Sequence, residues 1–137
     1  MSRPVAFSAY ITHFTSHLGI DQIIRYDGVL TNEGNAYNPL TGVFTCPKDG
    51  LYLLAFFTAT VNDGFSWVKL VVDGITVSNA VSNGVRVGND DQGGNVALIR
   101  LTAGQSVWTA TFFKPDIELD STSDFRHVTF SSVCLSD

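Results

Sequence analysis

The fold is decided by residues 26–56, which read YDGVLTNEGNAYNPLTGVFTCPKDGLYLLAF. The apolar run from Leu51 to Phe57 begins in this stretch and ends one residue beyond it. Alternate side chains of a strand point to opposite faces of a sheet, so this run is apolar on both faces. A strand that is apolar on both faces needs cover on both, so we expect it to be central or to lie at a subunit interface. Period-two side chains of neighbouring strands meet inside a sandwich, which predicts one core layer from Phe44, Tyr52, Leu54 and Phe56.

Turn signals divide the rest of the chain at short, fairly even intervals, which is typical of a β-sandwich or barrel. Alternating apolar runs between them predict strands over 5–11, 68–72, 96–98 and 107–109, with a last strand over 125–135. The dipeptide Asp73-Gly74 predicts a hairpin with a primed turn. Gly50 is expected at a turn position with positive φ, and the polar segment 114–124 is expected to be a loop or an irregular edge before the last strand.

Composition favours one well-packed domain over residues 1–137. The chain is 45% hydrophobic and only 15% charged, with ten phenylalanines, and at this length it can bury a core without a disulfide or a metal. The net charge of −5, without a Lys/Arg cluster, argues against a nucleic-acid partner. No run approaches the roughly twenty apolar residues that span a bilayer, so we expect no membrane insertion.

The spacing of aromatic residues between Tyr26 and Phe56 is more specific than composition. It resembles the signature of the globular head of complement component C1q, whose order is aromatic, Asn or Asp, aromatic, Phe, Gly, Tyr, Phe or Leu, aromatic. The residues that carry the resemblance are Tyr26, Asn32, Tyr37, Phe44, Gly50, Tyr52, Leu54 and Phe56. Residues 96–108 and 130–133 resemble later parts of the same family, with Gln105 in place of Asp and Ser132 in place of Gly.

The resemblance implies an all-β, ten-stranded jelly-roll sandwich of complement-head and tumour-necrosis-factor-like topology. It also implies assembly into a homotrimer. No Gly-X-Y collagen repeat precedes the head in this sequence, so we expect a stalkless, head-only member.

Catalysis is not indicated by any motif in the chain. The three histidines are accompanied by no nucleophile elbow, zinc-protease motif, phosphate loop or CxxC pair. On a strand, His13 and His17 would lie about 13 Å apart, too far for one metal ion. We therefore expect surface histidines and a non-enzymatic protein.

The segment Asn89 to Asn95 holds two adjacent carboxylates and two glycines. Such a segment offers hard oxygen ligands for Ca²⁺, although the same residues also form ordinary solvated turns. Calcium-binding members of the family carry Asp-Gln at the position of Asp91-Gln92 and an acidic residue where this chain has Asn83. The resemblance thus implies calcium ligands at Asn83, Asp91 and Gln92, with less charge than those members have.

Three further residues of this region are candidates for ligand binding: Arg86, Asn89 and Asp90. Their mixed charged and amide side chains suit hydroxyl or anionic groups. With the resemblance, this predicts a secreted, extracellular, lectin-like pattern-recognition protein of innate immunity, which binds carbohydrates or microbial surfaces through the loops of a trimer. The alternative is a structural or signalling trimer, similar to adiponectin or cerebellin heads, that engages a protein receptor.

Two cysteines, Cys46 and Cys134, could form a disulfide in a secreted domain. In the topology that the resemblance implies, the strand ending at Cys46 is expected beside the last strand, with the two thiols at opposite ends. Because a disulfide needs Cα atoms within about 7 Å, we expect buried free thiols.

Overall fold

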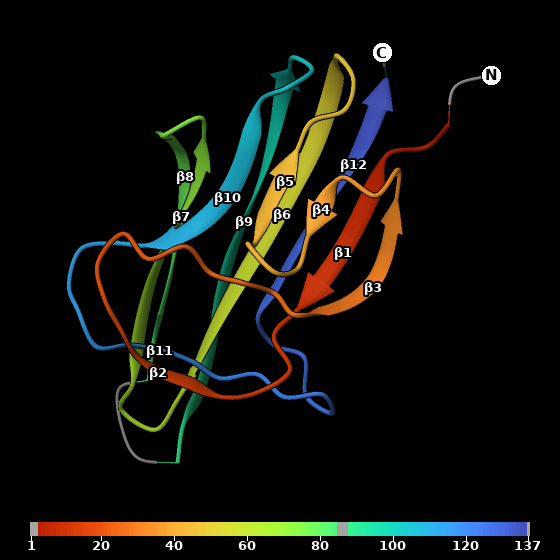
Figure 1. Cartoon of the computed structure of the whole chain (residues 1–137). Helices are drawn as coiled ribbons and strands as arrows, with labels where there is room; N and C mark the ends of the chain where they lie inside the picture. The colour runs from red at the N-terminus through yellow and green to blue at the C-terminus, as the bar shows by residue number, and fades with distance from the viewer. Residues whose placement is uncertain (1–2, 85–87, 137) are drawn as a thin grey trace.

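The computed structural model describes residues 3–84 and 88–136, which form two five-stranded antiparallel sheets packed face to face (Figure 1). The first sheet has the order β3-β1-β12-β6-β9 and the second the order β4-β5-β10-β7-β8. These ten strands confirm the predicted jelly-roll sandwich. Two further short strands, β2 and β11, pair with each other. The described residues contain no helix long and apolar enough to cross a membrane.

The strands follow the predicted apolar runs, with longer bounds in the middle of the chain. In the first sheet they are β1 (Ala6–Tyr10), β3 (Gly28–Glu33), β6 (Gly50–Val61), β9 (Asp90–Leu101) and β12 (Thr129–Ser136). In the second sheet they are β4 (Tyr37–Asn38), β5 (Val43–Thr45), β7 (Phe65–Val72), β8 (Ile75–Asn83) and β10 (Ser106–Thr111). The separate pair is β2 (Thr15–Leu18) and β11 (Ile117–Leu119).

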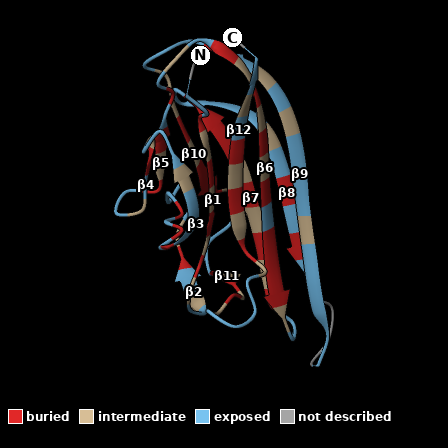
Figure 2. Ribbon diagram, turned by 90° about the vertical axis from the view of Figure 1, so that its right-hand side faces the viewer, coloured by how far each residue is buried: buried red, intermediate tan, exposed pale blue. Residues whose placement is uncertain are grey.

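Strand β6 is an interior strand of its sheet, next to the edge strand β9, as the two-faced apolar run predicted of a strand with neighbours on both sides. It lies between β12 and β9, and Tyr52, Leu54 and Phe56 are fully buried on its inward side. The outward residues of the same run are partly exposed, so β6 alternates between buried and intermediate in Figure 2.

The core between the sheets is a layer of aromatic rings. Phe7 on β1 stacks on Tyr37 on β4, with ring centroids 4.7 Å apart and planes 7° apart. Phe130 on β12 meets Phe7 edge to face at 4.9 Å, and Phe44 on β5 meets Tyr52 at 5.9 Å. Such contacts add to the hydrophobic burial of the rings and join strands from both sheets.

The buried tyrosines of this layer have hydrogen-bond partners. The hydroxyl of Tyr37 donates to the carbonyl of Tyr26 at 2.8 Å and accepts from the backbone N–H of Tyr26 at 3.0 Å. The side chain of Asn32 pairs with the backbone N–H and C=O of Tyr37. Hydrogen bonds as well as packing therefore hold together Tyr26, Asn32 and Tyr37, which are separated in the sequence motif.

The segment Asn89 to Asn95 was expected to form a glycine-rich loop or solvated turns, and this prediction is wrong for residues 90–95. Strand β9 begins at Asp90 and pairs with β6 along its whole length, from Asp90 opposite Val61 to Leu101 opposite Gly50. A Cβ at Gly93 would overlap the backbone carbonyl of Val81 on β8. The glycines thus permit a close approach between edge strands instead of making a turn.

One smaller expectation also needs correction. Gly50 does not have a positive φ; it opens β6, where a Cβ would lie 2.6 Å from the carbonyl oxygen of Ser136. A glycine is required there because a side chain would overlap β12. The polar segment 114–124, expected to be a loop or an irregular edge, contains the short strand β11.

The strand placement used for the cysteines is wrong. Cys46 follows β5 in the second sheet, whereas Cys134 lies on β12 in the first. Both are free thiols in this structure. They lie at the same end of the sandwich, near Tyr52, instead of at opposite ends.

The Asp73-Gly74 hairpin is confirmed, because both residues have positive φ, 47° and 85°. A Cβ at Gly74 would meet no atom within 4 Å, so Gly74→Ala imposes only a backbone cost. We expect it to lower the free energy of unfolding by about 1 kcal/mol in urea denaturation. Gly19→Ala is the control, since its Cβ would make an ordinary 3.8 Å contact without positive φ. An equal loss in both variants would contradict the turn assignment.

The buried tyrosines predict a loss of stability at alkaline pH. Burial raises the pKa of Tyr37 to about 12 and raises the pKa of Tyr26 and Tyr52 further. An unfolded tyrosine ionises near pH 10, so above that pH the unfolded chain releases protons that the folded chain retains. The free energy of unfolding should therefore be unaffected by these groups below about pH 9 and fall from pH 10 to 12.

The variant Tyr37→Phe tests this cause. Urea denaturation between pH 8 and 12 should show a shallower alkaline decline for Tyr37→Phe than for the unaltered protein, although the variant starts less stable because it loses the bonds to Tyr26. Tyr10→Phe, at a partly exposed position, is the control for removal of a phenol. An identical slope in all three proteins would contradict the assignment to buried tyrosine.

Candidate functional site

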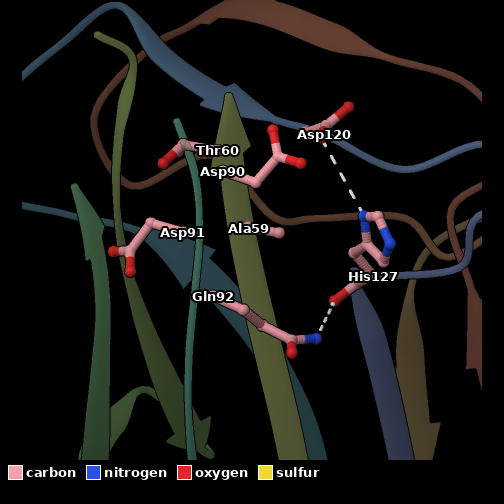
Figure 3. Close-up of a pocket in the computed structure, with 7 residues that line it drawn as sticks. All are labelled: Ala59, Thr60, Asp90, Asp91, Gln92, Asp120 and His127. Atoms are coloured by element: carbon pink, nitrogen blue, oxygen red, sulfur yellow. Dashed lines mark hydrogen bonds and ion pairs between the residues drawn. The ribbon is translucent and has the colours of Figure 1, made fainter. Parts of the chain in front are cut away.

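A polar pocket of about 200 Å³ lies where β6 ends and β9 begins. It is lined by Ala59, Thr60, Asp90, Asp91, Gln92, Asp120 and His127 (Figure 3). In Figure 1 this end of the sandwich lies opposite the end that carries both chain termini. The pocket brings the predicted Asp90, Asp91 and Gln92 together with two residues from the segment between β10 and β12.

Asp90 is the acidic group most available to a ligand. It is exposed, and its carboxylate makes no hydrogen bond or ion pair with any residue in 3–84 or 88–136. In Figure 3 this carboxylate points toward the side of the pocket where Asp120 and His127 lie. It can therefore accept hydrogen bonds from an incoming hydroxyl or ligate a cation.

Asp91 has a structural partner instead. One oxygen of its carboxylate accepts the backbone N–H of Asn83 at 2.7 Å and the hydroxyl of Ser82 at 3.3 Å. These bonds fasten the end of β8 to the start of β9. The side chain of Asp91 points away from His127 in Figure 3, because successive residues of a strand face opposite sides.

The expected calcium ligands are therefore not gathered around one point. The amide of Gln92 donates to the carbonyl oxygen of His127 at 3.0 Å, on the other side of the strand from Asp91. Asn83 meets Asp91 through its backbone N–H, a donor that cannot bind a cation. Within the described part of the chain, no three His, Cys, Asp or Glu residues form a group suited to a metal ion.

His127 and Asp120 complete the pocket, and sequence reasoning did not select them. The Nδ1 atom of His127 lies 3.9 Å from a carboxylate oxygen of Asp120. Their positions depend on the irregular segment 112–128, whose path no spacing rule predicts. Only the folded chain brings them beside β9.

An exposed aromatic ring lies next to His127, one of the residues that line the pocket. Phe125 is 65% exposed, and its ring centroid lies 6.2 Å from that of His127. Sequence reasoning placed Phe125 at the start of the last strand, which in fact begins at Thr129. Only the exposure of this large apolar ring beside polar pocket residues, a property of the folded chain, identifies Phe125 as a candidate.

The other predicted residues are placed as follows. Arg86 lies outside the described residues. Asn89 is exposed, and its carbonyl accepts the backbone N–H of Asn62 at 2.8 Å, which joins two loops beside the pocket. His13 and His17 are surface residues, each within 3.7 Å of an aspartate, and neither lines the pocket.

The fold and site define a compact jelly-roll head with a polar pocket at one end. The chain matches the C1q domain over residues 6–133 and belongs to this family, which confirms the resemblance inferred from its aromatic spacing.

Sequence relatives agree with this assignment. The chain is 36% identical to the heavy metal-binding protein HIP of Mytilus edulis over 72 residues, covering 53% of this chain and 34% of HIP. It is 32% identical to a complement C1q subcomponent of Mus musculus over 101 residues, covering 69% of this chain and 37% of the mouse protein. The chain thus spans about a third of the length of these relatives.

Solved structures agree on the fold. The globular domain of zebrafish complement 1qA protein superimposes with a TM-score of 0.74 at 19% identity, covering 98% of both chains. The tumour necrosis factor Eiger from S. frugiperda gives a TM-score of 0.74 at 13% identity, covering 99% of this chain and 95% of Eiger. These likenesses extend over the whole sandwich.

Proposed function

We propose that the protein is a secreted, non-enzymatic recognition module that binds carbohydrates of microbial surfaces in the pocket beside β9. The observation that carries this proposal is the exposed ring of Phe125 beside His127, which lines a pocket together with carboxylates and an amide. A sugar ring offers an apolar face to an aromatic side chain, while its hydroxyls donate to carboxylates such as that of Asp90. Membership of the C1q domain family is compatible with recognition in innate immunity.

A role for calcium is part of the proposal. Asp90, Asp120 and the side-chain oxygen of Gln92 all line the pocket and are hard oxygen ligands. Asp90 has no other partner among the described residues, so its charge is available to a cation. A bound ion would then also coordinate the hydroxyl oxygens of a sugar in its open coordination positions.

Assembly into a homotrimer is supported by the apolar outer face of the first sheet. Leu53 on β6 lies directly between Val133 on β12 and Leu98 on β9, so three apolar side chains form a row across the sheet. Leu98 is 61% exposed, and β9 is mostly exposed at the edge of the sandwich (Figure 2). An apolar row of this kind suits a permanent subunit interface. Three pockets on one trimer would add avidity for a repetitive surface.

A second candidate function, a ligand for a protein receptor, is favoured by a different surface. Phe113 is 65% exposed at the centre of a tight turn with φ of 81°, and its ring lies 4.8 Å from that of Trp67. The ammonium of Lys114 sits over the ring of Phe65 at 4.1 Å. Exposed aromatic side chains of this kind are enriched at protein interfaces.

The variant Phe125→Ala separates the two functions. We expect the unaltered protein to bind microbial glycans on an array and Phe125→Ala to bind about tenfold more weakly, since a stacked ring contributes on the order of 1.4 kcal/mol. Phe113→Ala is the matched control, because Phe113 is equally exposed but remote from the pocket. Equal glycan binding by both variants would contradict this site, and no glycan binding by the unaltered protein would contradict the carbohydrate function.

The same array repeated with a chelator tests calcium. We expect binding to fall when calcium is removed and to return when it is added back. Unchanged binding would remove calcium from the proposal and leave the pocket as a metal-free site.

The trimer is tested by mass measurement in solution with light scattering. The unaltered protein should have three times the chain mass of 14.8 kDa, and Leu98→Glu should be monomeric because it buries a charge in the interface. Leu40→Glu is the control, since Leu40 is 76% exposed but lies in the turn after β4, away from the outer face. A monomeric unaltered protein would contradict the proposed assembly.

A further inference from the structure

Cys46 and Cys134 face the same end of the core from opposite sheets. Cys46 follows β5 and is 1% exposed, and Cys134 is the last of the alternating inward positions Phe130, Ser132 and Cys134 on β12. In Figure 1 the end of β5, the start of β6 and the end of β12 lie together at the upper end of the sandwich. The two cysteines are 88 positions apart in the sequence, so only the fold brings them to one place.

The hydroxyl of Tyr52 links the surroundings of the two thiols. It donates to the carbonyl oxygen of Lys48 at 2.8 Å, and the Sγ of Cys46 donates to the same oxygen at 3.1 Å. Tyr52 is also directly opposite Cys134 in the β6–β12 ladder. Burial, and then interactions with both thiols, raise the pKa of Tyr52. Both sulfur atoms are therefore neighbours of the phenolic oxygen of Tyr52.

Gly50 gives a second, independent measure of this proximity. A Cβ at Gly50 would lie 2.7 Å from the Sγ of Cys134. Gly50 ends the turn 46–50, which Cys46 begins. The Cys134 thiol therefore packs against the turn that carries Cys46, and any larger residue at Gly50 would separate them.

We propose that Cys46 and Cys134 are the partners of an inter-sheet disulfide, formed when the folded protein meets a low-molecular-weight disulfide such as glutathione disulfide. The thiolate of Cys134 attacks the oxidant, which releases one thiolate and leaves a mixed disulfide on Cys134. The thiolate of Cys46 then attacks the Sγ of Cys134 and releases the second thiol. Two protons leave the protein thiols and are taken up by the released thiolates, while the oxidant gains the two electrons.

The first step has a route from solvent. A pocket of about 260 Å³ is lined by Cys134 together with Arg3, Lys48 and Ser136. Two cationic side chains at this pocket favour the approach of an anionic oxidant such as glutathione disulfide. Cys46 has no such access because it is buried, which assigns the attacking role to Cys134 and the resolving role to Cys46.

The test is oxidation of the full native chain in a glutathione disulfide buffer, followed by acid quench and mass spectrometry. The number of reactive thiols in denaturant should fall from two per chain to none, with the chain two hydrogens lighter and a linked Cys46–Cys134 peptide in a non-reducing map. The melting temperature should rise by roughly 10 °C, because the bond closes a long loop in the unfolded chain.

Single variants assign the two roles. Cys46→Ser should retain one glutathione adduct on Cys134, whereas Cys134→Ser should remain unmodified while folded, because Cys46 is buried. The measurement on the unaltered chain does not depend on either variant folding. Two free thiols after oxidation, a persistent glutathione adduct on unaltered Cys134, or bonds between chains would each overturn the inference. The disulfide inference is independent of carbohydrate binding, so a negative result for one proposal does not contradict the other.

Discussion

The two sheets are held together by one buried layer of aromatic rings. Phe7 stacks on Tyr37 across the sandwich, Phe130 meets Phe7 edge to face, and Tyr37 is fixed to the backbone of Tyr26 by two hydrogen bonds. Every ring of this set comes from a different segment of the chain. Because protein interiors are close-packed, the layer specifies the register of several strands at once. The positions of both ends of the sandwich depend on that register.

The two ends of the sandwich present different chemistry. One end carries the pocket with Asp90, Asp120 and His127, and the other carries the pair of thiols around Tyr52. The first arises where β6 and β9 extend past the aromatic layer, whereas the second lies at the border of that layer, beside Tyr52. Strand β9 contributes to the first end only because Gly93 allows it to run close to β8.

Sequence spacing predicted the fold well for a physical reason. Strand periodicity, a turn such as Asp73-Gly74 and the spaced aromatics are local properties, and each has one structural solution in a sandwich. Two of the errors occurred where glycine was interpreted as a turn former, at Gly50 and at 90–95. There the deciding quantity was the distance to a neighbouring strand, which is absent from a local pattern.

The amino-acid sequence by itself determined the family, the core residues and the presence of Asp90 and Gln92 near one another on the chain. Tertiary structure alone decided that Asp91 holds Asn83, that His127 lines the pocket with Phe125 beside it, and that Cys46 meets the surroundings of Cys134. The core could be predicted because burial follows the alternation of neighbours along the chain. The sites could not, because their residues converge from irregular segments and opposite sheets whose approach is set by packing over the whole domain.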